Sequence, residues 1–455
     1  MAIAPSDRGL WTSKTGFILA AAGSAIGLGN IWRFPFTAGE NGGGAFVLIY
    51  LMFVALIGIP VLLAELSIGR QTERNPVGAF KALVPGSWWP VVGGLGVATG
   101  FGILSFYSVI AGWTLAYLYK AIVGGFGMNL TAADSEAIFG EIVGDPLLAI
   151  VLTVAFLLLT ILVVRGGVSG GIERATKVLM PLLFILLVIL AIRAVTLPGA
   201  MEGVSYLFKP DFSEITTSVA MNALGQALFS LSLGMGAMIT YGSYFPKSEN
   251  LPIAGVSVAV FDTLIAVLAG LIIFPALFAV GVEPGAGPSL VFVVLPTIFD
   301  SLPAGGFFAI AFYFLLTIAA LTSTISLLEV VVSYFVDERG WSRNKAAWVL
   351  GSTCMVLAVP SALSQGANAT LTNMAGGGFL NLQNIIWGNF SLSIGALLIC
   401  VFVGWKWGVP AARASLEGGG FALPAAGLWS FLIRFVCPVA VAIVLIFIIV
   451  TGNYF

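Results

Sequence analysis

Gly23-Ser24-Ala25-Ile26-Gly27-Leu28-Gly29-Asn30 lies in the middle of an apolar segment that runs from about residue 15 to residue 37. Its three glycines disfavour a continuous helix, and inside a bilayer each freed backbone group costs several kcal/mol unless it finds a partner. Carbonyl groups at the end of a first half-helix suit a hard cation, and amide groups at the start of a second half-helix suit a carboxylate. The stretch therefore predicts a broken membrane helix that holds Na⁺ and an amino acid.

The composition is that of a membrane protein. Of the 455 residues, 59% are hydrophobic and 9% are charged, against roughly 25% charged in soluble domains. The chain has no His, and its three Cys lie inside apolar runs, so few residues could serve as a catalytic nucleophile or as its general base. We therefore expect no enzyme activity. The net charge of -1 gives no basic surface, so the expected surroundings are a lipid bilayer rather than nucleic acid.

Eleven segments are long and apolar enough to cross a bilayer core, which takes about 20 residues per helix. The sequence thus predicts an all-α polytopic membrane protein with 11 transmembrane helices. The predicted segments are 15–37, 44–69, 90–123, 146–164, 175–196, 217–244, 252–281, 305–336, 344–362, 379–404 and 428–451.

The distribution of Lys and Arg predicts the orientation. If the N-terminus is inside, all of these residues except Arg33, Lys120, Arg193 and Lys209 fall on the cytoplasmic side, as the positive-inside rule requires. An odd number of helices then places the C-terminus outside. We expect a multi-pass protein of the cell's inner (plasma) membrane.

A second glycine-containing interruption, residues 230–236, divides the segment 217–244 as the first divides 15–37. Two broken helices five segments apart favour an inverted repeat of five plus five helices with a midplane site. Glycine is also common in membrane helices because it lets neighbours approach, but that explains a single break better than a matched pair. The expected single transporter domain, 1–455, comprises a cytoplasmic N-terminus 1–14, repeats 15–196 and 217–404, and an extra helix 428–451.

Several motifs resemble those of the sodium-coupled neurotransmitter and amino-acid symporters, and the resemblance covers nearly the whole chain. They are Gly-Ser-Ala-Ile-Gly-Leu-Gly-Asn-Ile-Trp-Arg-Phe-Pro (23–35), Glu-Asn-Gly-Gly-Gly-Ala-Phe (40–46), Gly-Ile-Pro (58–60) followed by Glu65 and Gly69-Arg70, and Phe-Ser-Leu-Ser-Leu-Gly (229–234). The resemblance implies a bacterial member with the leucine-transporter fold. It also implies alternating access around a fixed site, driven by the sodium gradient.

The resemblance implies two sodium sites built from oxygen ligands, which hard cations prefer. In the first, the substrate carboxylate completes the shell, so that sodium and amino acid raise each other's affinity. Its expected ligands are Ala25, Asn30, Ser230 and Asp262. The second would join the first helix to the eighth, through Gly23, Ile26, Ala319, Thr322 and Ser323. The two hydroxyls of this set could instead merely bond back to preceding carbonyls.

For the substrate, the resemblance implies that amides near Leu28 and Gly29 and the hydroxyl of Tyr107 face the carboxylate. Carbonyls of the two breaks and a serine hydroxyl would take the amine, and a mostly apolar wall would take the side chain. The residues expected around the substrate are Ser24, Ala25, Leu28, Gly29, Ile103, Tyr107, Phe229, Ser230, Ser232, Met235, Ser323, Ser326 and Leu327. Small Ser24 and adaptable Met235 favour hydrophobic and aromatic L-amino acids.

The resemblance also implies gates. Tyr107 and Phe229 would close over the substrate from outside. The inner latch would pair Arg8 with Asp337, supported by Trp11 and Tyr244. At the outer gate Arg33 aligns with Asn384, where many relatives have an acid, so that a hydrogen bond at best replaces an ion pair.

Another departure concerns chloride. Chloride-dependent relatives have an asparagine at the position of Asp262, and some bacterial members carry a glutamate one turn later, where this chain has Ala266. We expect Asp262 to supply the fixed negative charge, so that transport needs no chloride.

Some alternatives stay open. Glu65 is either a site residue or a group that bonds to broken backbone, and Glu329 is either functional or a polar contact near the cytoplasm. A channel would need subunit symmetry and a continuous pore. A proton-coupled carrier of an amino acid or amine, with Asp262 or Glu65 titrating, is the closer alternative.

Overall fold

The computed structural model describes residues 9–126, 129–285 and 287–454, and every regular element within them is helical. All eleven predicted segments are helical, with ends within a few residues of those expected. The long helices are α3 (Gly44–Phe53), η3 (Val54–Gly58) and α4 (Ile59–Thr72) in one span, α6 (Pro90–Ile122), α8 (Pro146–Val164), η4 (Val168–Glu173) with α9 (Arg174–Val195), α13 (Leu251–Ala279), α15 (Gly305–Arg339), α16 (Arg343–Leu363), α18 (Phe379–Gln383) with η7 (Asn384–Ser391), α19 (Leu392–Val401) and η8 (Phe402–Lys406), and α21 (Ala426–Phe431) with η9 (Leu432–Val436) and α22 (Cys437–Thr451).

Two of the eleven segments are broken. The first consists of α1 (Lys14–Ala25), then η2 (Gly29–Arg33) and α2 (Phe34–Glu40), with a bend of 53° between the two halves. The second consists of α11 (Thr217–Ser230) and α12 (Ala237–Gly242). Within the described residues nine helices are long and apolar enough to span a membrane, or ten if the bent pair is one span. The halves of the second broken segment are too short to be counted by that criterion.

Short helices lie between the long ones. They are α5 (Pro76–Leu83), α7 (Ala132–Gly144), α10 (Ala200–Phe208), η5 (Phe212–Glu214), η6 (Gly287–Leu290), α14 (Val294–Ser301), α17 (Ala369–Thr372) and α20 (Val409–Leu416).

Local sequence signals explain several helix ends. The Ser13 hydroxyl accepts a hydrogen bond from the Gly16 amide at the start of α1, and Asp145 caps α8 in the same way just before Pro146. Both satisfy amide groups that a helix start leaves free. Gly340, with φ of 66°, ends α15 in the left-handed conformation that glycine adopts without strain.

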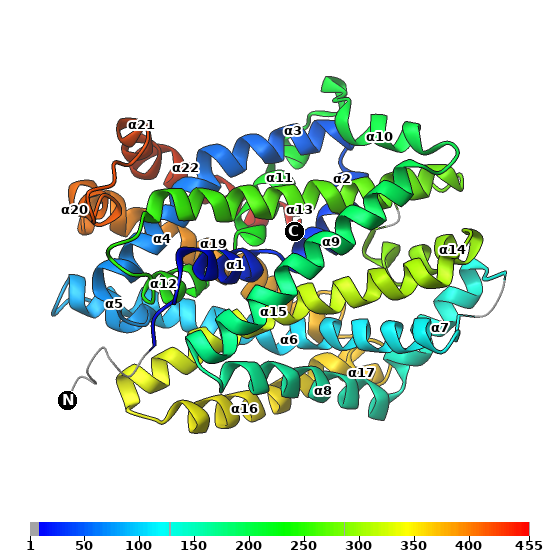
Figure 1. Ribbon diagram of the computed structural model, residues 1–455, viewed down its shortest axis with the longest axis horizontal. Coiled ribbons are helices and arrows are strands. Elements are labelled where there is room, and N and C mark those ends of the chain that lie inside the picture. Colours follow the sequence, from blue (N-terminus) through cyan, green and yellow to red (C-terminus); the bar gives the residue numbers. More distant parts are fainter. Residues whose placement is uncertain (1–8, 127–128, 286, 455) are drawn as a thin grey trace.

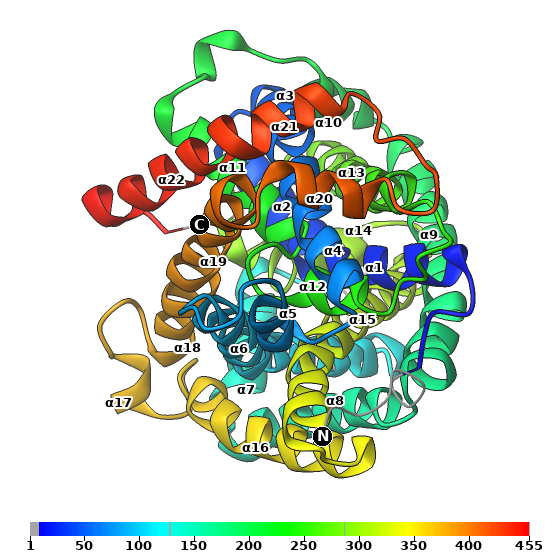
Figure 2. The ribbon, with the colours of Figure 1, turned by 90° about the vertical axis from the view of Figure 1, so that its left-hand side faces the viewer.

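The helices run roughly along the longest axis of the molecule (Figure 1). Viewed from the end where α5 and α20 lie, α1, α12 and α15 are near the centre, and α8, α9, α16 and α22 lie around them (Figure 2). In α15, 94% of the most apolar stretch is buried, against 33% in the span 426–451. The central helices therefore face protein, and the outer ones present apolar surface.

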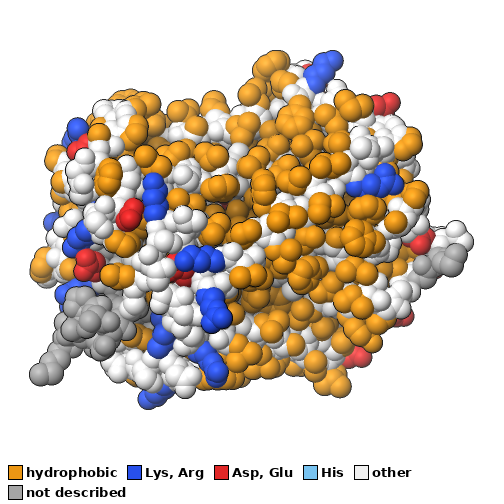
Figure 3. Space-filling model, viewed as in Figure 1, with side chains coloured by type: hydrophobic (Ala, Val, Ile, Leu, Met, Phe, Trp, Pro, Cys, Tyr) orange, Lys and Arg blue, Asp and Glu red, His pale blue; other side chains and the backbone are white. Residues whose placement is uncertain are grey.

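Hydrophobic side chains cover the middle of the face in Figure 3, and Lys and Arg gather toward the end where α5 and α20 lie. A wide apolar belt between more polar ends is the surface that a bilayer-spanning protein needs.

Candidate functional site

The two helix breaks face each other in the interior. The Ser232 hydroxyl of the second break donates to the Ser24 carbonyl of the first at 3.0 Å. The Gln226 amide of α11 donates to the Gly29 carbonyl at 2.8 Å. Protein groups thus satisfy part of the backbone that the breaks expose.

Glu65 of α4 serves the second break. Its Oε1 accepts the Gly234 N–H at 2.7 Å, and its side chain is fully buried. Gly234 has a φ of 79° and Ser232 a φ of 54°, so the chain here turns through left-handed backbone. Of the two readings of Glu65, the structure supports the one in which it bonds to broken backbone.

Three of the four residues expected at the first sodium site form one buried cluster. The Asn30 amide donates to Asp262 Oδ1 at 2.7 Å and to the Ser230 hydroxyl at 3.0 Å. The Ser230 hydroxyl donates to Asp262 Oδ2 at 2.7 Å. The fourth, Ala25, is the last residue of α1. A buried carboxylate is costly without a partner. Here Asn30 turns its amide N–H toward the carboxylate while its own Oδ1 accepts the Gly27 N–H at 3.1 Å, so the oxygens that this cluster offers a cation are those of Asp262 and Ser230.

The residues expected at the second sodium site also converge. Thr322 Oγ1 lies 3.4 Å from the Ile26 carbonyl and 3.0 Å from the Ala319 carbonyl, and Ser323 Oγ lies 3.4 Å from the Ile26 carbonyl. Gly23 packs against them, because a Cβ added there would lie 3.3 Å from Thr322 Cβ. Thr322 bonds back to its own helix, as the alternative held, yet it also faces the break in α1.

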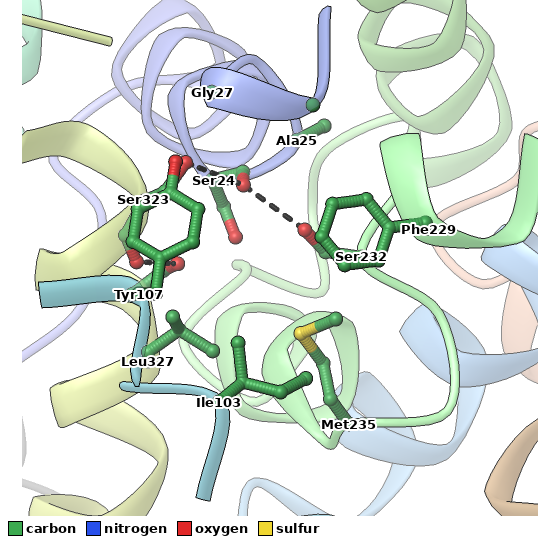
Figure 4. Close-up of a pocket in the computed structure, with 12 residues that line it drawn as sticks. Ser24, Ala25, Gly27, Ile103, Tyr107, Phe229, Ser232, Met235, Ser323 and Leu327 are labelled. Carbon is green, nitrogen blue, oxygen red and sulfur yellow. Dashed lines mark hydrogen bonds between the residues drawn. The ribbon is translucent and has the colours of Figure 1, made fainter. Parts of the chain in front are cut away.

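A pocket lies between the breaks, with about 350 Å³ of space free of protein atoms, part of it open to solvent. The Leu28 N–H donates to the Tyr107 hydroxyl at 2.9 Å, which joins the amide and the hydroxyl expected to face a carboxylate. The backbone of the first break lies opposite Ile103, Met235 and Leu327 (Figure 4). The lining residues are Ser24, Ala25, Gly27, Gly29, Ile103, Tyr107, Phe229, Ser232, Met235, Ser323, Ser326 and Leu327.

The pocket wall differs from the expected set at three positions. Gly27 lines it but was not expected there. Leu28 and Ser230 are not among the lining residues: the Leu28 N–H, the group expected to face the carboxylate, donates to Tyr107, and the Ser230 hydroxyl belongs to the cluster around Asp262. The signal for Gly27 was its place among the glycines of the break.

A larger cavity with about 2090 Å³ of such space adjoins the pocket and shares Gly29, Tyr107 and Phe229 with it. Arg33 and Asn384 both line this vestibule, but no hydrogen bond joins them within the described part of the chain. Arg33 lies instead over the ring of Phe229, 4.4 Å from its centroid, because neutral Asn384 offers no charge and an aromatic face attracts a cation.

At the opposite end of the molecule, Trp11 joins the chain before α1 to the end of α12. Its indole donates to the Tyr241 carbonyl at 3.0 Å, and its backbone N–H donates to the Tyr244 carbonyl at 3.2 Å. Asp337 accepts from the Asn75 backbone and amide, both at 3.0 Å. Arg8 lies outside the described residues, so its pairing with Asp337 stays a prediction.

Glu329 is a polar contact at this same end. It accepts the Tyr244 hydroxyl at 2.7 Å and forms an ion pair with Arg343. The buried carboxylate of α15 thereby joins the chain just after α12 to the start of α16, as the second of the two readings of Glu329 held.

Comparison with known proteins agrees with this geometry. A family model described as the sodium:neurotransmitter symporter family matches residues 8–132 and 140–454. The chain belongs to this family.

Relatives include the sodium-dependent transporter YhdH of Bacillus subtilis, 42% identical over 95% of this chain and 96% of its own. The sodium- and chloride-dependent GABA transporter ine of Drosophila melanogaster is 31% identical over 72% of this chain and 39% of its own. Among solved structures, MhsT in complex with L-phenylalanine is 48% identical, with a TM-score of 0.89, over 96% of this chain and 99% of that one. Membership in the symporter family makes the chain a multi-pass, sodium-dependent membrane transporter and not an enzyme.

Proposed function

We propose that the chain imports a hydrophobic or aromatic L-amino acid together with Na⁺, by alternating access and without chloride. The observation that carries this proposal is the pocket between the two breaks. It has polar backbone on one side and an apolar wall on the other. The two clusters expected to bind Na⁺, around Asp262 and around Thr322, lie next to it.

The polar side of the pocket suits both charged groups of an amino acid. The region of the Leu28 N–H and the Tyr107 hydroxyl would bind the carboxylate. The Ser232 hydroxyl and the carbonyls of Ala25, Phe229 and Ser230 would bind the ammonium group. An amine without a carboxylate would leave the amide side unpaired, and such a loss is costly in a buried site.

The apolar side suits a hydrophobic side chain. Ile103, Met235 and Leu327 face the space, and unbranched Met235 can yield to a ring. The L-phenylalanine complex of the similar transporter MhsT supports this substrate class.

Sodium would occupy two sites. At the first, Asp262 would hold the ion beside the substrate carboxylate, so that each ligand raises the affinity for the other. At the second, Thr322 and Ser323 would share an ion with carbonyls of α1 and α15, which would tie the two helices together. Because Asp262 supplies the negative charge, no chloride is needed.

The proposed orientation places α5 and α20 in the cytoplasm. The gathering of Lys and Arg at that end supports it (Figure 3). The vestibule at the other end would then open to the outside, and substrate would pass Tyr107 and Phe229 to reach the pocket.

Uptake of labelled L-phenylalanine into proteoliposomes tests this proposal. An inward Na⁺ gradient should drive accumulation, whereas a proton gradient with K⁺ replacing Na⁺ should not. L-Leucine should compete, and phenylethylamine, which lacks the carboxylate, should compete poorly. Accumulation driven by the proton gradient alone would establish the proton-coupled alternative.

A further inference from the structure

Glu173, the last residue of η4, holds the chain segment that leads into α1. Its side chain is 1% exposed. It accepts hydrogen bonds from the Thr12 backbone at 2.8 Å, the Thr12 hydroxyl at 2.5 Å and the Ser13 hydroxyl at 3.4 Å. These contacts join parts of the chain about 160 residues apart.

Lys177 completes the arrangement. Its ammonium group lies 2.7 Å from Glu173 Oε1 and 3.2 Å from the Thr12 hydroxyl. Carboxylate, ammonium and hydroxyl therefore contact one another in a closed set of three. Since hydrogen bonds to charged groups are stronger than neutral ones, this is a firm attachment for a segment at the edge of the molecule.

The first turn of α1 lies directly on this carboxylate. A Cβ added to Gly16 would lie 1.9 Å from Glu173 Oε1. Seven residues further along each helix, a Cβ added to Gly23 would lie 3.1 Å from Met180 Sδ. Two helical turns, about 10 Å, thus separate Glu173 from the level of the second sodium cluster, and α9 supports α1 at both levels.

We propose that Glu173 is a positioning residue that holds the start of α1 closed over the route from the second sodium site to the cytoplasm. Release of Thr12 and Ser13 from Glu173 then accompanies inward opening. This inference rests on the proposed function, since only a transporter with alternating access needs such a release. It is independent of Arg8 and Asp337.

The first test is a sodium titration of L-phenylalanine binding to the full-length protein. Glu173→Ala and Glu173→Gln should raise the Na⁺ concentration for half-maximal binding, by about tenfold for Ala, because the inward-open state competes with the sodium-bound state. Maximal binding per protein should not change, as it would if the variants were partly unfolded. Glu417→Ala is the matched control, because it removes an i,i+4 pair with Arg413 at an exposed site.

A second variant approaches the contact from its other side. Thr12→Val removes the hydroxyl but keeps the helix start, and it should shift the titration in the same direction by a smaller factor. In the Glu173→Gln/Thr12→Val double variant the two shifts should be less than multiplicative, because both remove one contact. Independent, multiplicative shifts would contradict a shared latch.

The third readout is thiol accessibility. Ala20, buried and one turn beyond Gly16, is replaced by Cys in a background without the native cysteines. In Na⁺, a water-soluble maleimide should label it slowly in the Glu417→Ala control and several-fold faster in Glu173→Ala. Equal labelling rates and equal sodium titrations would overturn the inference. L-Phenylalanine binding that does not depend on Na⁺ in the wild-type protein and in the Glu417→Ala control would instead overturn the proposed function.

Discussion

At the scale of single residues, the site depends on one charge and on small side chains. Asp262 is the carboxylate of the first cluster, and it is fully buried with Asn30 and Ser230 as donors. Gly27 leaves room between Ser323 and Tyr107. Each of these features makes a separate prediction.

Asp262→Asn should raise the Na⁺ concentration needed for half-maximal L-phenylalanine binding by about 10-fold to 100-fold. The variant removes a charged oxygen ligand, and interactions of charged groups are worth about 1.5–3 kcal/mol. A Na⁺ titration of binding measures this, with Asp211→Asn as the control, because this carboxylate is exposed and accepts hydrogen bonds from nearby Ser213. Unchanged sodium affinity would show that Asp262 is not a ligand.

Gly27→Ala should weaken substrate binding by about 10-fold to 100-fold. Its Cβ would lie 2.4 Å from Ser323 Oγ and 2.7 Å from the Tyr107 hydroxyl, and overpacking of this kind costs about 1–3 kcal/mol. Gly94→Ala is the control, since a Cβ there meets nothing within 4 Å. Equilibrium binding distinguishes the two, and equal affinities would mean that the pocket is wider than described.

At the scale of helices, buried polar contacts join elements that are far apart in sequence. Glu65 joins α4 to the second break, Glu173 at the end of η4 joins that helix to the chain before α1, and Glu329 joins α15 to the chain after α12 and to the start of α16. Each of these acids is buried and has a defined partner.

Arg343→Ala should lower the unfolding temperature in detergent, because it leaves Glu329 buried and unpaired. Breaking a buried ion pair costs about 3–5 kcal/mol. Arg413→Ala, at an exposed pair, should have little effect. Glu329→Gln combined with Arg343→Met should recover part of the loss, and a melting temperature equal to that of the control would contradict the prediction.

The sequence predicts elements better than it predicts these ties. Gly23, Gly27 and Gly29 predict the first break because glycine weakens a helix in any surroundings. The apolar run 146–164 predicts α8 because its length alone is enough to define a membrane span. Glu173 is different. Its partner Thr12 lies 161 residues away in the sequence, and the hydrophobic periodicity of a sequence does not show which helices pack together.

The Arg33 contact was missed for a related reason. The family resemblance pointed to Asn384, but the position of Arg33 over Phe229 depends on side-chain packing at the vestibule. Asn384 also lies in a π-helical stretch, 384–391, which rotates side chains relative to an α-helix and which composition does not reveal.

At the scale of the whole molecule, the proposed sodium sites, the helix breaks and the contact at Glu173 would form one coupled system. Sodium at the first cluster would adjoin the substrate, sodium at the second would hold α1 to α15, and Glu173 would hold α1 to α9. Binding from the vestibule side would therefore favour the closed cytoplasmic side, as symport requires.

The most direct test of the account is equilibrium binding of labelled L-phenylalanine to the purified protein in NaCl, in KCl and in sodium gluconate. The account predicts strong binding in NaCl, loss of binding in KCl and undiminished binding in sodium gluconate. Binding that survives the replacement of Na⁺ by K⁺ would contradict sodium coupling at this site, and binding that disappears in gluconate would contradict the role given to Asp262.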